Sequence, residues 1–259
     1  MAGRARPRLR ELHRRFLTWI ARDITVAATS RSALVLAPHP DDETIGCGGT
    51  ILRKTDAGAH VVVVIAADGE DLVRRAEATE ACRRLGVPRE QVRFLAFPDG
   101  DLSAHVGEVR DSLRAVIQET RPDDIYIPSP IDNHPDHRTL AAAVDMVEPA
   151  TLAGCKVYAY PVWFWNRWAW ADRAAPHWRQ RLQLVWRPLR FTLSTRVVKV
   201  DISSVVARKR AALDAHASQV GGPGSDPSRQ VLDPKWLATF FLDDEVFFQH
   251  RQRRNRRER

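Results

Sequence analysis

The chain has 259 residues, of which 44% are hydrophobic and 28% charged, a composition that is ordinary for a globular protein and excludes a fibrous or wholly disordered one. This length can bury a substantial core, and it fits one α/β domain better than two. The net charge of +8 comes from the ends, because residues 1–22 carry +6 and residues 251–259 carry +5, which leaves −3 for residues 23–250. A mildly acidic body argues against a nucleic-acid-binding protein.

The N-terminal segment predicts a basic amphipathic helix over residues 9–24, whose apolar side chains recur at helical spacing: Leu9, Leu12, Phe16, Trp19 and Ile20. We expect this stripe to pack against the body. Weak contact with a membrane surface, helped by the arginines, is the alternative. The apolar stretch 16–20 is too short for a signal peptide or a membrane span. We therefore divide the chain into a basic N-terminal helix (1–28), a main domain (29–250) and a basic tail (251–259).

From residue 33, short apolar runs alternate with amphipathic stretches. Strands are predicted at 33–37, 60–67, 92–97, 124–128 and 156–162, and helices at 44–55, 72–85, 108–119 and 138–147. The run 60–67 (HVVVVIAA) is β-branched and continuous, as in a parallel strand that helices cover on both faces. The alternation predicts an α/β fold of the Rossmann-like kind, with a doubly wound, mostly parallel sheet in three α/β/α layers.

The alternating pattern weakens after Pro161. A late strand is predicted at 197–200, a helix at 203–217 and a flexible loop at 221–228 (GGPGSDPS). Before them, four tryptophans crowd into residues 163–170 (WFWNRWAW). This segment would form either an aromatic wall for a sugar ring or lipid, or a buried flap or oligomer contact, and the sequence leaves both interpretations open.

Polar side chains follow the first predicted strand directly, in the run His39-Pro40-Asp41-Asp42. Ligands of open α/β sheets bind beyond the carboxyl ends of the strands, so a site is expected here. His39 and Asp42 lie three residues apart on a proline-stiffened turn, so both side chains can converge on one ion. Imidazole with carboxylate is a normal set of zinc ligands. Asp41 is then left beside the metal, close enough to take a proton from a bound water.

A second polar run, His134-Pro135-Asp136-His137, follows the strand predicted at 124–128. If the two strands are neighbours, the two loops face each other, and one of these histidines completes a set of two imidazoles and one carboxylate. Such a set leaves positions for water and substrate, which is typical of a catalytic zinc site. The alternative is that Asp41 or Asp42 only caps the following helix, and that the histidines are ordinary loop residues.

The two runs together resemble the PIG-L/LmbE-like deacetylases, which include N-acetylglucosaminyl-phosphatidylinositol deacetylases and deacetylases of the mycothiol and bacillithiol pathways. The likeness covers about residues 33–220 and includes further short motifs: Arg75-Ala76-Glu77, Leu85-Gly86-Val87, Phe97-Pro98-Asp99-Gly100, Lys209 and His216-Ala217-Ser218-Gln219. The resemblance implies a Rossmann-like fold and one zinc ion per chain, with Fe²⁺ as an alternative metal. The implied zinc ligands are His39, Asp42 and His137.

The resemblance also implies roles for the remaining site residues. Asp41 is the expected general base, and His134 is expected to polarise the scissile carbonyl or to protonate the leaving amine. Arg75 and Asp99 are expected to contact the sugar. The implied reaction removes an acetyl group from an N-acetylglucosamine-type glycoconjugate, either a small molecule or lipid-linked, by Asp-assisted attack of zinc-bound water.

Three other functions compete with this hypothesis. An amidase acting on a different amide, such as a thiol conjugate or a natural product, would use the same zinc site. A carbohydrate-binding protein without activity is disfavoured, because all five residues of the metal and catalytic set are present. A dinucleotide-binding protein is disfavoured because Gly46, Gly48 and Gly49 do not form the G-x-G-x-x-G pattern, and we expect them to allow close packing of a helix on the sheet.

The number and spacing of the cysteines indicate the cellular compartment in which the protein is expected. Three cysteines at no metal-like spacing indicate neither a disulfide framework nor a cysteine zinc site, and they fit the reducing cytoplasm. The sequence does not predict an oligomeric state.

Overall fold

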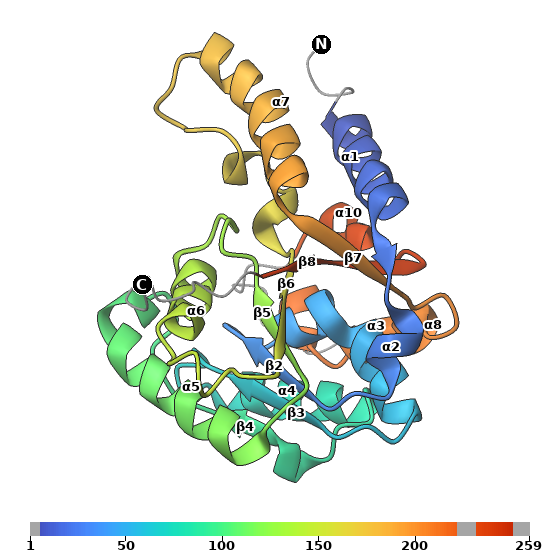
Figure 1. Ribbon diagram of the computed structural model, residues 1–259, viewed down its shortest axis with the longest axis vertical. Coiled ribbons are helices and arrows are strands. Elements are labelled where there is room, and N and C mark those ends of the chain that lie inside the picture. Colours follow the sequence, from blue (N-terminus) through green and yellow to red (C-terminus); the bar gives the residue numbers. More distant parts are fainter. Residues whose placement is uncertain (1–5, 222–231, 251–259) are drawn as a thin grey trace.

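The computed structural model describes residues 6–221 and 232–250 (Figure 1). The tail 251–259 and all but the first residue of the predicted loop 221–228 lie outside the described residues. The strands of the described ranges are β1 (Arg22–Asp23), β2 (Ala33–Ala37), β3 (Val61–Ile65), β4 (Val92–Phe94), β5 (Asp124–Pro128), β6 (Lys156–Tyr160), β7 (Arg196–Asp201) and β8 (Asp244–Gln249).

Helices connect these strands. The α-helices are α1 (Arg6–Ile20), α2 (Thr25–Thr29), α3 (Asp42–Asp56), α4 (Leu72–Arg84), α5 (Val106–Thr120), α6 (Pro135–Asp145), α7 (His177–Ser194), α8 (Val206–Leu213), α9 (Ala217–Val220) and α10 (Pro234–Leu237). Short 3-10 turns are η1 (Arg89–Gln91), η2 (Leu102–His105), η3 (Trp163–Trp165), η4 (Arg167–Ala169) and η5 (Ala238–Phe240).

All eight strands form one mixed sheet in the order β1-β7-β8-β6-β5-β2-β3-β4. The pairs from β6 to β4 and the pair β1–β7 are parallel, whereas β8 runs antiparallel to both β6 and β7. The predicted α/β class with a mostly parallel, doubly wound sheet is thus confirmed. The sequence did not predict β1 or the antiparallel β8.

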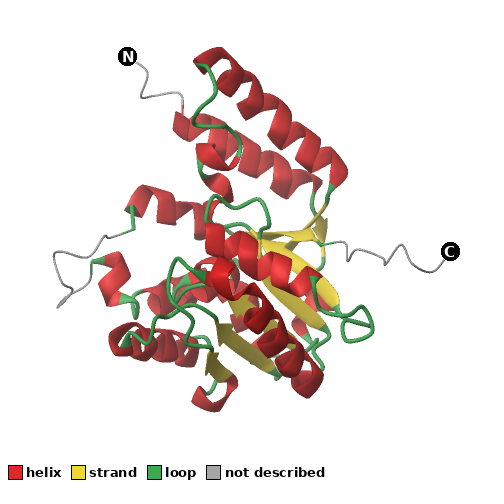
Figure 2. Ribbon diagram, turned by 90° about the vertical axis from the view of Figure 1, so that its left-hand side faces the viewer, coloured by secondary structure: helices red, strands yellow, loops and turns green. Residues whose placement is uncertain are grey.

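Helices cover both faces of the sheet, which gives the expected three layers (Figures 1 and 2). Helices α5 and α6 pack on each other on one face, and α3, α4 and α8 pack together on the other. This arrangement explains why β2, β3 and β5 are buried along their whole length. A strand that is covered on both faces needs apolar side chains in both directions, which is the continuous pattern of residues 61–65.

The glycines of α3 allow this helix to lie close to its neighbours, as the sequence predicted. A Cβ atom at Gly46 would overlap the ring of Tyr160 on β6, and a Cβ atom at Gly49 would lie 2.6 Å from Cγ2 of Ile202. The Tyr160 hydroxyl donates a hydrogen bond to the Leu36 carbonyl at 2.8 Å. The glycines therefore serve packing of α3, which carries Asp42 at its first position.

Several predicted boundaries differ from the structure. The predicted strands at 60–67, 92–97 and 156–162 end earlier, because their last residues leave the sheet to form the loops at its carboxyl edge. The predicted helix at 203–217 is instead two helices, α8 and α9. The chain turns between them, where His216 precedes α9 with its side chain fully buried.

The prediction that the apolar stripe of α1 packs against the body is wrong for the stripe residues whose side chains the structure describes. Leu17 is fully buried and Arg14 is 6% exposed, whereas Leu12, Phe16, Trp19 and Ile20, which belong to the stripe, are exposed. The reason is the Arg14 guanidinium, which donates to the carbonyls of Thr239 and Asp244 and lies over the ring of Trp165. These contacts turn the face of His13, Arg14 and Leu17 toward the body.

The tryptophan-rich segment 163–170 is largely part of the core. Phe164, Trp165 and Trp170 are buried, and the indole of Trp170 donates to the Phe164 carbonyl at 2.9 Å. These contacts favour the buried interpretation for the three residues. The segment leads into α7, an 18-residue helix that the sequence analysis did not predict and that contains Pro188.

A buried ion pair joins the C-terminal part of the chain to α3. The Lys209 ammonium on α8 donates to Glu245 of β8 at 2.8 Å and to the carbonyls of Ile45 and Phe240 at 2.9 Å. The Glu245 carboxylate also accepts the backbone N–H groups of Gly49 and Thr50 at 2.8 Å. Both charges are therefore paired and fully hydrogen-bonded, which is the condition under which buried charges are tolerated.

Loss of one partner of this pair should be costly. We expect Lys209→Met to lower the free energy of unfolding by about 3–5 kcal/mol, because the Glu245 charge would remain buried and unpaired. Urea denaturation followed by circular dichroism measures the change. The neighbouring Arg208→Met is the matched control. It removes a half-exposed pair with Asp56 and should cost at most about 1 kcal/mol. Equal losses in both variants would contradict this account.

Candidate active site

The polar loops of the two predicted runs meet at the carboxyl edge of the sheet. Strand β2 lies between β3 and β5, with Val35 paired to Val63 on one side and to Tyr126 on the other. From β2 the chain continues to β3 on one side, and it returns to β5 on the other. This is the switch point at which open α/β sheets bind ligands. The loops after β2 and β5 therefore face each other.

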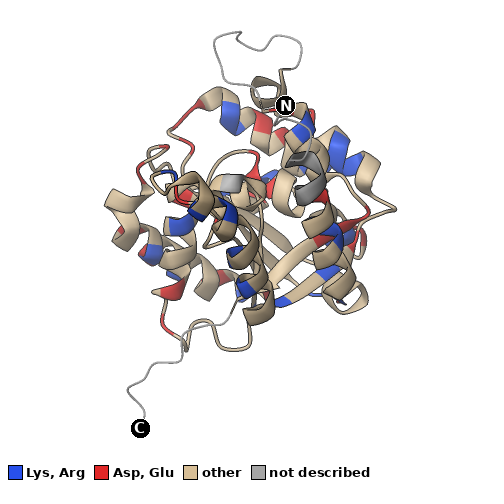
Figure 3. Ribbon diagram, turned by 90° about the horizontal axis from the view of Figure 1, so that it is seen from above, with Lys and Arg blue, Asp and Glu red and all other residues tan. Residues whose placement is uncertain are grey.

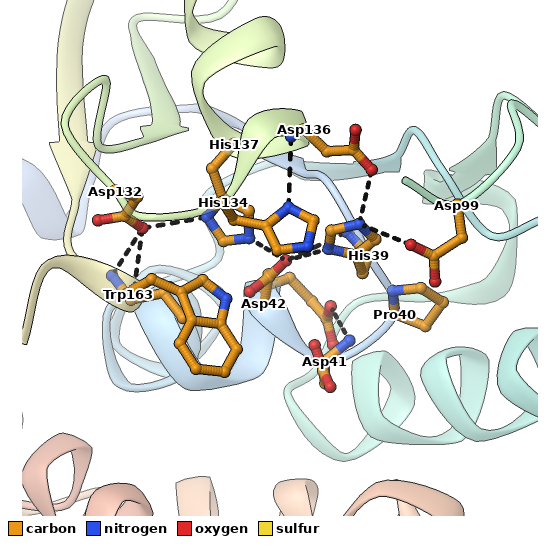
Figure 4. Close-up of polar contacts among 12 residues, drawn as sticks. His39, Pro40, Asp41, Asp42, Asp99, Asp132, His134, Asp136, His137 and Trp163 are labelled. Atoms are coloured by element: carbon orange, nitrogen blue, oxygen red, sulfur yellow. Dashed lines mark hydrogen bonds and ion pairs between the residues drawn. The ribbon is translucent and has the colours of Figure 1, made fainter. Parts of the chain in front are cut away.

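The carboxylate of Asp42 lies between two imidazoles (Figure 4). Its Oδ2 atom is 3.2 Å from Nδ1 of His39 and 3.2 Å from Nε2 of His137. Asp42 begins α3 and His137 lies in the first turn of α6, so each residue is held at the start of a helix. The structure thus brings together the three residues that the sequence predicted as zinc ligands.

The outward-facing nitrogen of each imidazole is held by another buried carboxylate. His137 Nδ1 lies 3.0 Å from Oδ2 of Asp132, and His39 Nε2 lies 3.0 Å from Oδ2 of Asp136. A ring N–H donated to these carboxylates leaves the other nitrogen of each ring as a lone pair aimed at Asp42. This pattern of an outer carboxylate that orients a ligating histidine is characteristic of metal sites.

The arrangement fits a divalent cation. His137 Nε2 is buried, and its 3.2 Å contact with Asp42 Oδ2 does not have the geometry of a hydrogen bond. One ring nitrogen each of His39, His134 and His137 lies within 4.8 Å of the others. Two nitrogen lone pairs and a carboxylate oxygen that point at one another repel unless a cation or protons lie between them. Two imidazoles and one carboxylate are a normal ligand set for zinc.

The pKa values express the same crowding of negative charge. Burial opposes a charge on His137, but the carboxylates of Asp42 and Asp132 raise its pKa to about 9. Burial also opposes a charge on His39, and hydrogen bonds to Asp136, Asp42 and Asp99 nevertheless raise its pKa well above the usual range. The pocket therefore favours positive charge between these rings, which a metal cation would supply.

A second group of potential ligands lies on the far side of the His39 ring. It consists of His39, Asp99 and Asp136. The Asp136 oxygens, however, already accept the backbone N–H groups of Gly100 at 2.7 Å and Leu102 at 3.2 Å. Asp136 therefore orients His39 and anchors the loop that carries Asp99.

Asp41 has an unusual backbone and a carboxylate that does not cap its helix. Its φ of 131° lies in the region that favours glycine, and its N–H donates to Oε2 of Glu43 at 3.0 Å. Asp41 stands at the N-cap position of α3, but its side chain makes no capping hydrogen bond. The helix-cap alternative is therefore not supported for Asp41. Burial and the neighbouring Asp42 charge raise the pKa of Asp41 to about 7, which is suited to a general base at neutral pH.

His134 is held as a neutral hydrogen-bond donor. The Asp136 N–H donates to His134 Nδ1 at 3.3 Å, so the proton of the neutral ring is on Nε2. Burial and the nearby rings of His39 and His137 lower the pKa of His134 to about 4. Its ring centre is 4.7 Å from that of His39. His134 can therefore offer an N–H group to a substrate oxygen beside the metal position.

Of the two residues predicted to contact a sugar, the structure brings only Asp99 to the site. Asp99 Oδ1 lies 3.1 Å from His39 Nε2, and its Oδ2 accepts from Arg74 Nη1 at 3.0 Å. Arg75 instead bonds the buried Asp68, and its guanidinium stacks on Phe94. The physical reason is helix geometry. Adjacent residues on α4 point about 100° apart, so only one of the two arginines can face the pocket.

Five supporting residues had no role assigned from the sequence: Asp132, Asp136, Arg74, Glu43 and His216. The last two form a buried pair, in which His216 Nε2 lies 3.1 Å from Oε1 of Glu43. Asp136 was visible in the second polar run but had no assigned role. Asp132 and Glu43 lie beside the predicted runs, and only their burial identifies them as supports. His216 belongs to a motif whose function the spacing alone did not define.

Comparison with known proteins identifies the family of the chain. Residues 34–147 match the family model described as PIG-L: GlcNAc-PI de-N-acetylase. The diacetylchitobiose deacetylase of Thermococcus kodakarensis is 31% identical over 207 residues, which cover 73% of this chain and 70% of that protein. The 1D-myo-inositol 2-acetamido-2-deoxy-alpha-D-glucopyranoside deacetylase of Rhodococcus erythropolis is 28% identical over 247 residues, covering 75% of this chain and 83% of that one.

Solved structures share the fold. The conserved protein TT1542 of Thermus thermophilus superposes with a TM-score of 0.57 at 27% identity, over 88% of this chain and 99% of that chain. The A40926 pseudoaglycone deacetylase Dbv21 superposes with a TM-score of 0.59 at 16% identity, which shows the fold alone. On the sequence matches and the fold together, the chain belongs to the PIG-L/LmbE family of deacetylases.

Proposed function

We propose that this chain is a zinc-dependent N-deacetylase that hydrolyses the acetamido group of an N-acetylglucosamine-type glycoconjugate. The observation that carries the proposal is the convergence of His39, Asp42 and His137, with Asp41 and His134 beside them. Relatives named for diacetylchitobiose and for a 2-acetamido-2-deoxyglucopyranoside of inositol support this substrate class. Either a small soluble glycoconjugate or a lipid-linked one would fit it.

His39, Asp42 and His137 are the residues that we assign to the metal. When bound, zinc acidifies water and polarises a carbonyl as a Lewis acid. Three protein ligands leave positions open for water and substrate, as in catalytic sites. Iron could occupy the same ligands, since imidazole and carboxylate also suit Fe²⁺.

Asp41 and His134 are assigned the proton-handling and polarising roles. With a pKa of about 7, Asp41 can accept a proton from the attacking water and return it to the leaving amine. His134 donates its Nε2–H to the amide oxygen, on which negative charge develops as the water adds. The low pKa of His134 favours this hydrogen-bonding role over protonation of the amine. One such donor contributes about 3–4 kcal/mol in other hydrolases.

We further assign Arg74, in place of Arg75, to the sugar together with Asp99. The Arg74 guanidinium donates to the Pro40 carbonyl at 3.3 Å as well as to Asp99, so it borders the loop of His39 and Asp41. Asp99 is half-exposed, which leaves its carboxylate accessible to hydroxyl groups of a ligand.

Asp41→Asn should retain zinc and lose activity by about 100- to 10,000-fold, because the amide cannot accept the proton. The measurement is acetate release from a panel of substrates, with metal content determined by mass spectrometry. The panel holds N-acetylglucosamine, its inositol and phosphatidylinositol conjugates and a polyprenyl-diphosphate conjugate. Acetate from one member identifies the substrate class. No release from zinc-loaded protein across the panel would contradict this substrate class and favour an amidase on a different amide.

Asp132→Asn should lower the affinity for zinc by about 10- to 100-fold, because an amide cannot orient His137 Nδ1–H as a carboxylate does. Competition with a chelating dye measures the affinity, and circular dichroism checks the fold. Asp111→Asn changes an exposed carboxylate on α5 and is the matched control. An unchanged affinity in the Asp132 variant would contradict the proposed ligand set.

Arg74→Gln should raise the Michaelis constant by about tenfold or more, since a charge-assisted hydrogen bond to substrate is lost. Arg75→Gln should leave the Michaelis constant unchanged and lower only the thermal stability, because its partner is the buried Asp68. Steady-state kinetics on the best substrate of the panel compares the two variants. The opposite outcome would restore Arg75 to the role that the sequence predicted.

A further inference from the structure

Helices α1 and α7 lie at one end of the molecule and expose apolar side chains that the fold leaves uncovered. Both contact β7, and both extend beyond the sheet (Figures 1 and 2). Neither is a membrane span, because no helix among the described residues is long and apolar enough to cross a bilayer. Insertion across a membrane therefore does not explain the exposed apolar faces of α1 and α7.

Helix α7 carries one continuous apolar stripe on its outer side. The stripe residues are between 42% and 78% exposed and recur mostly three or four positions apart, so they lie along one face: Trp178, Leu182, Val185, Trp186, Leu189 and Leu193. We call these six residues the α7 stripe. Scattered exposed apolar residues are normal, but a row that includes two tryptophans is a contiguous patch of the kind that marks a binding surface.

A different face of α7 already holds this helix on the body. Gln180 and Thr192 are buried, and the Phe191 ring packs against Phe164, Trp170 and Phe248 with centres 4.8–5.7 Å apart. The α7 stripe is therefore not needed to fold the chain. Its side chains are available to a partner.

The charged residues of α7 itself are all arginines. Helix α7 contains four arginines and no acidic residue. By their positions on the helix, Arg179 and Arg190 border one edge of the stripe, and Arg181 borders the other. All three are exposed. Figure 3 looks onto this end of the molecule and marks the basic positions in blue.

Helix α1 adds a second apolar face of the same kind. Leu12, Phe16, Trp19 and Ile20 are exposed by 38–81%, with the rings of Phe16 and Trp19 6.2 Å apart. The hydrogen bonds of Arg14 hold the opposite side of α1 against the body. This apolar face therefore points outward.

We propose that the α7 stripe, with the exposed face of α1, docks this protein on an anionic lipid bilayer. A helix with an apolar face, arginines at its edges and tryptophans among its apolar residues is suited to lie in the plane of the interface. Tryptophan is enriched at that depth, and each arginine near the surface gains from the negative potential of anionic lipids. This inference does not depend on the proposed deacetylase activity.

The charge pattern disfavours a second copy of this chain as the occupant. A two-fold contact of the stripe with itself would bring the arginine edges of two α7 helices together, and α7 offers no carboxylate to compensate them. Such like-charge contacts oppose association. An anionic surface instead complements the same arginines.

Flotation of the full-length chain with lipid vesicles tests the proposal. We expect binding to vesicles of phosphatidylcholine with about one third phosphatidylglycerol, and weaker binding to phosphatidylcholine alone. The triple variant Leu182→Gln, Trp186→Gln and Leu193→Gln should reduce the partition onto anionic vesicles at least tenfold. Changing Arg179, Arg181 and Arg190 to Gln should reduce the partition onto anionic vesicles by about fivefold for each arginine. The partition onto phosphatidylcholine alone should not change.

A matched control replaces three exposed apolar residues elsewhere, Val26, Met146 and Leu242, by Gln and should bind like the wild type. Circular dichroism and thermal denaturation confirm that each variant is folded. Absence of wild-type binding to anionic vesicles would overturn the proposal, as would full binding by the stripe variant. A wild-type dimer that the stripe variant converts to a monomer, without vesicle binding, would overturn it in favour of a second copy.

Discussion

The position of β2 between two parallel neighbours constrains every polar side chain of the site. Parallel strands end at the same edge of a sheet, so the loops after β2 and β5 must meet there although 97 residues separate His39 from Asp136. Helices α3 and α6 begin directly after these loops. Their first turns fix Asp42 and His137 on rigid elements, and the chain needs no long loop to assemble the ligand set.

Buried carboxylates then hold the site in place from several directions. Asp132 and Asp136 each orient one imidazole, while Glu43 holds the strained backbone of Asp41 and contacts His216 from the C-terminal region. Each of these acids is bonded to at least one group from another segment of the chain, so disturbing one segment removes a partner from a buried acceptor. The site is consequently a connected network and not a set of independent residues.

Local sequence patterns predicted the alternating strands and helices up to β6. The rule for parallel sheets predicted that the two polar runs would meet if their strands were neighbours. The remainder depends on tertiary contacts that no local pattern encodes. Pro188 and the crowded tryptophans obscured α7. The antiparallel strand β8 pairs with β6 and β7, which lie far from it in the sequence. The orientation of α1 depends on Arg14 meeting the carbonyls of Thr239 and Asp244. The choice between Arg74 and Arg75 depends on how α4 is rotated against the pocket.

Asp132 has a second set of contacts, which links the proposed metal site to the outer helices. Besides His137, its Oδ2 accepts the backbone N–H groups of Val162 and Trp163 at 3.1 Å, and these residues begin the segment that leads into α7. A ligand that displaces this segment would therefore change the orientation of His137. Because coupling free energies are reciprocal, that ligand would alter metal affinity by the same factor by which the metal alters the affinity for the ligand. The same carboxylate thus holds both the proposed ligand His137 and the backbone at residues 162–163.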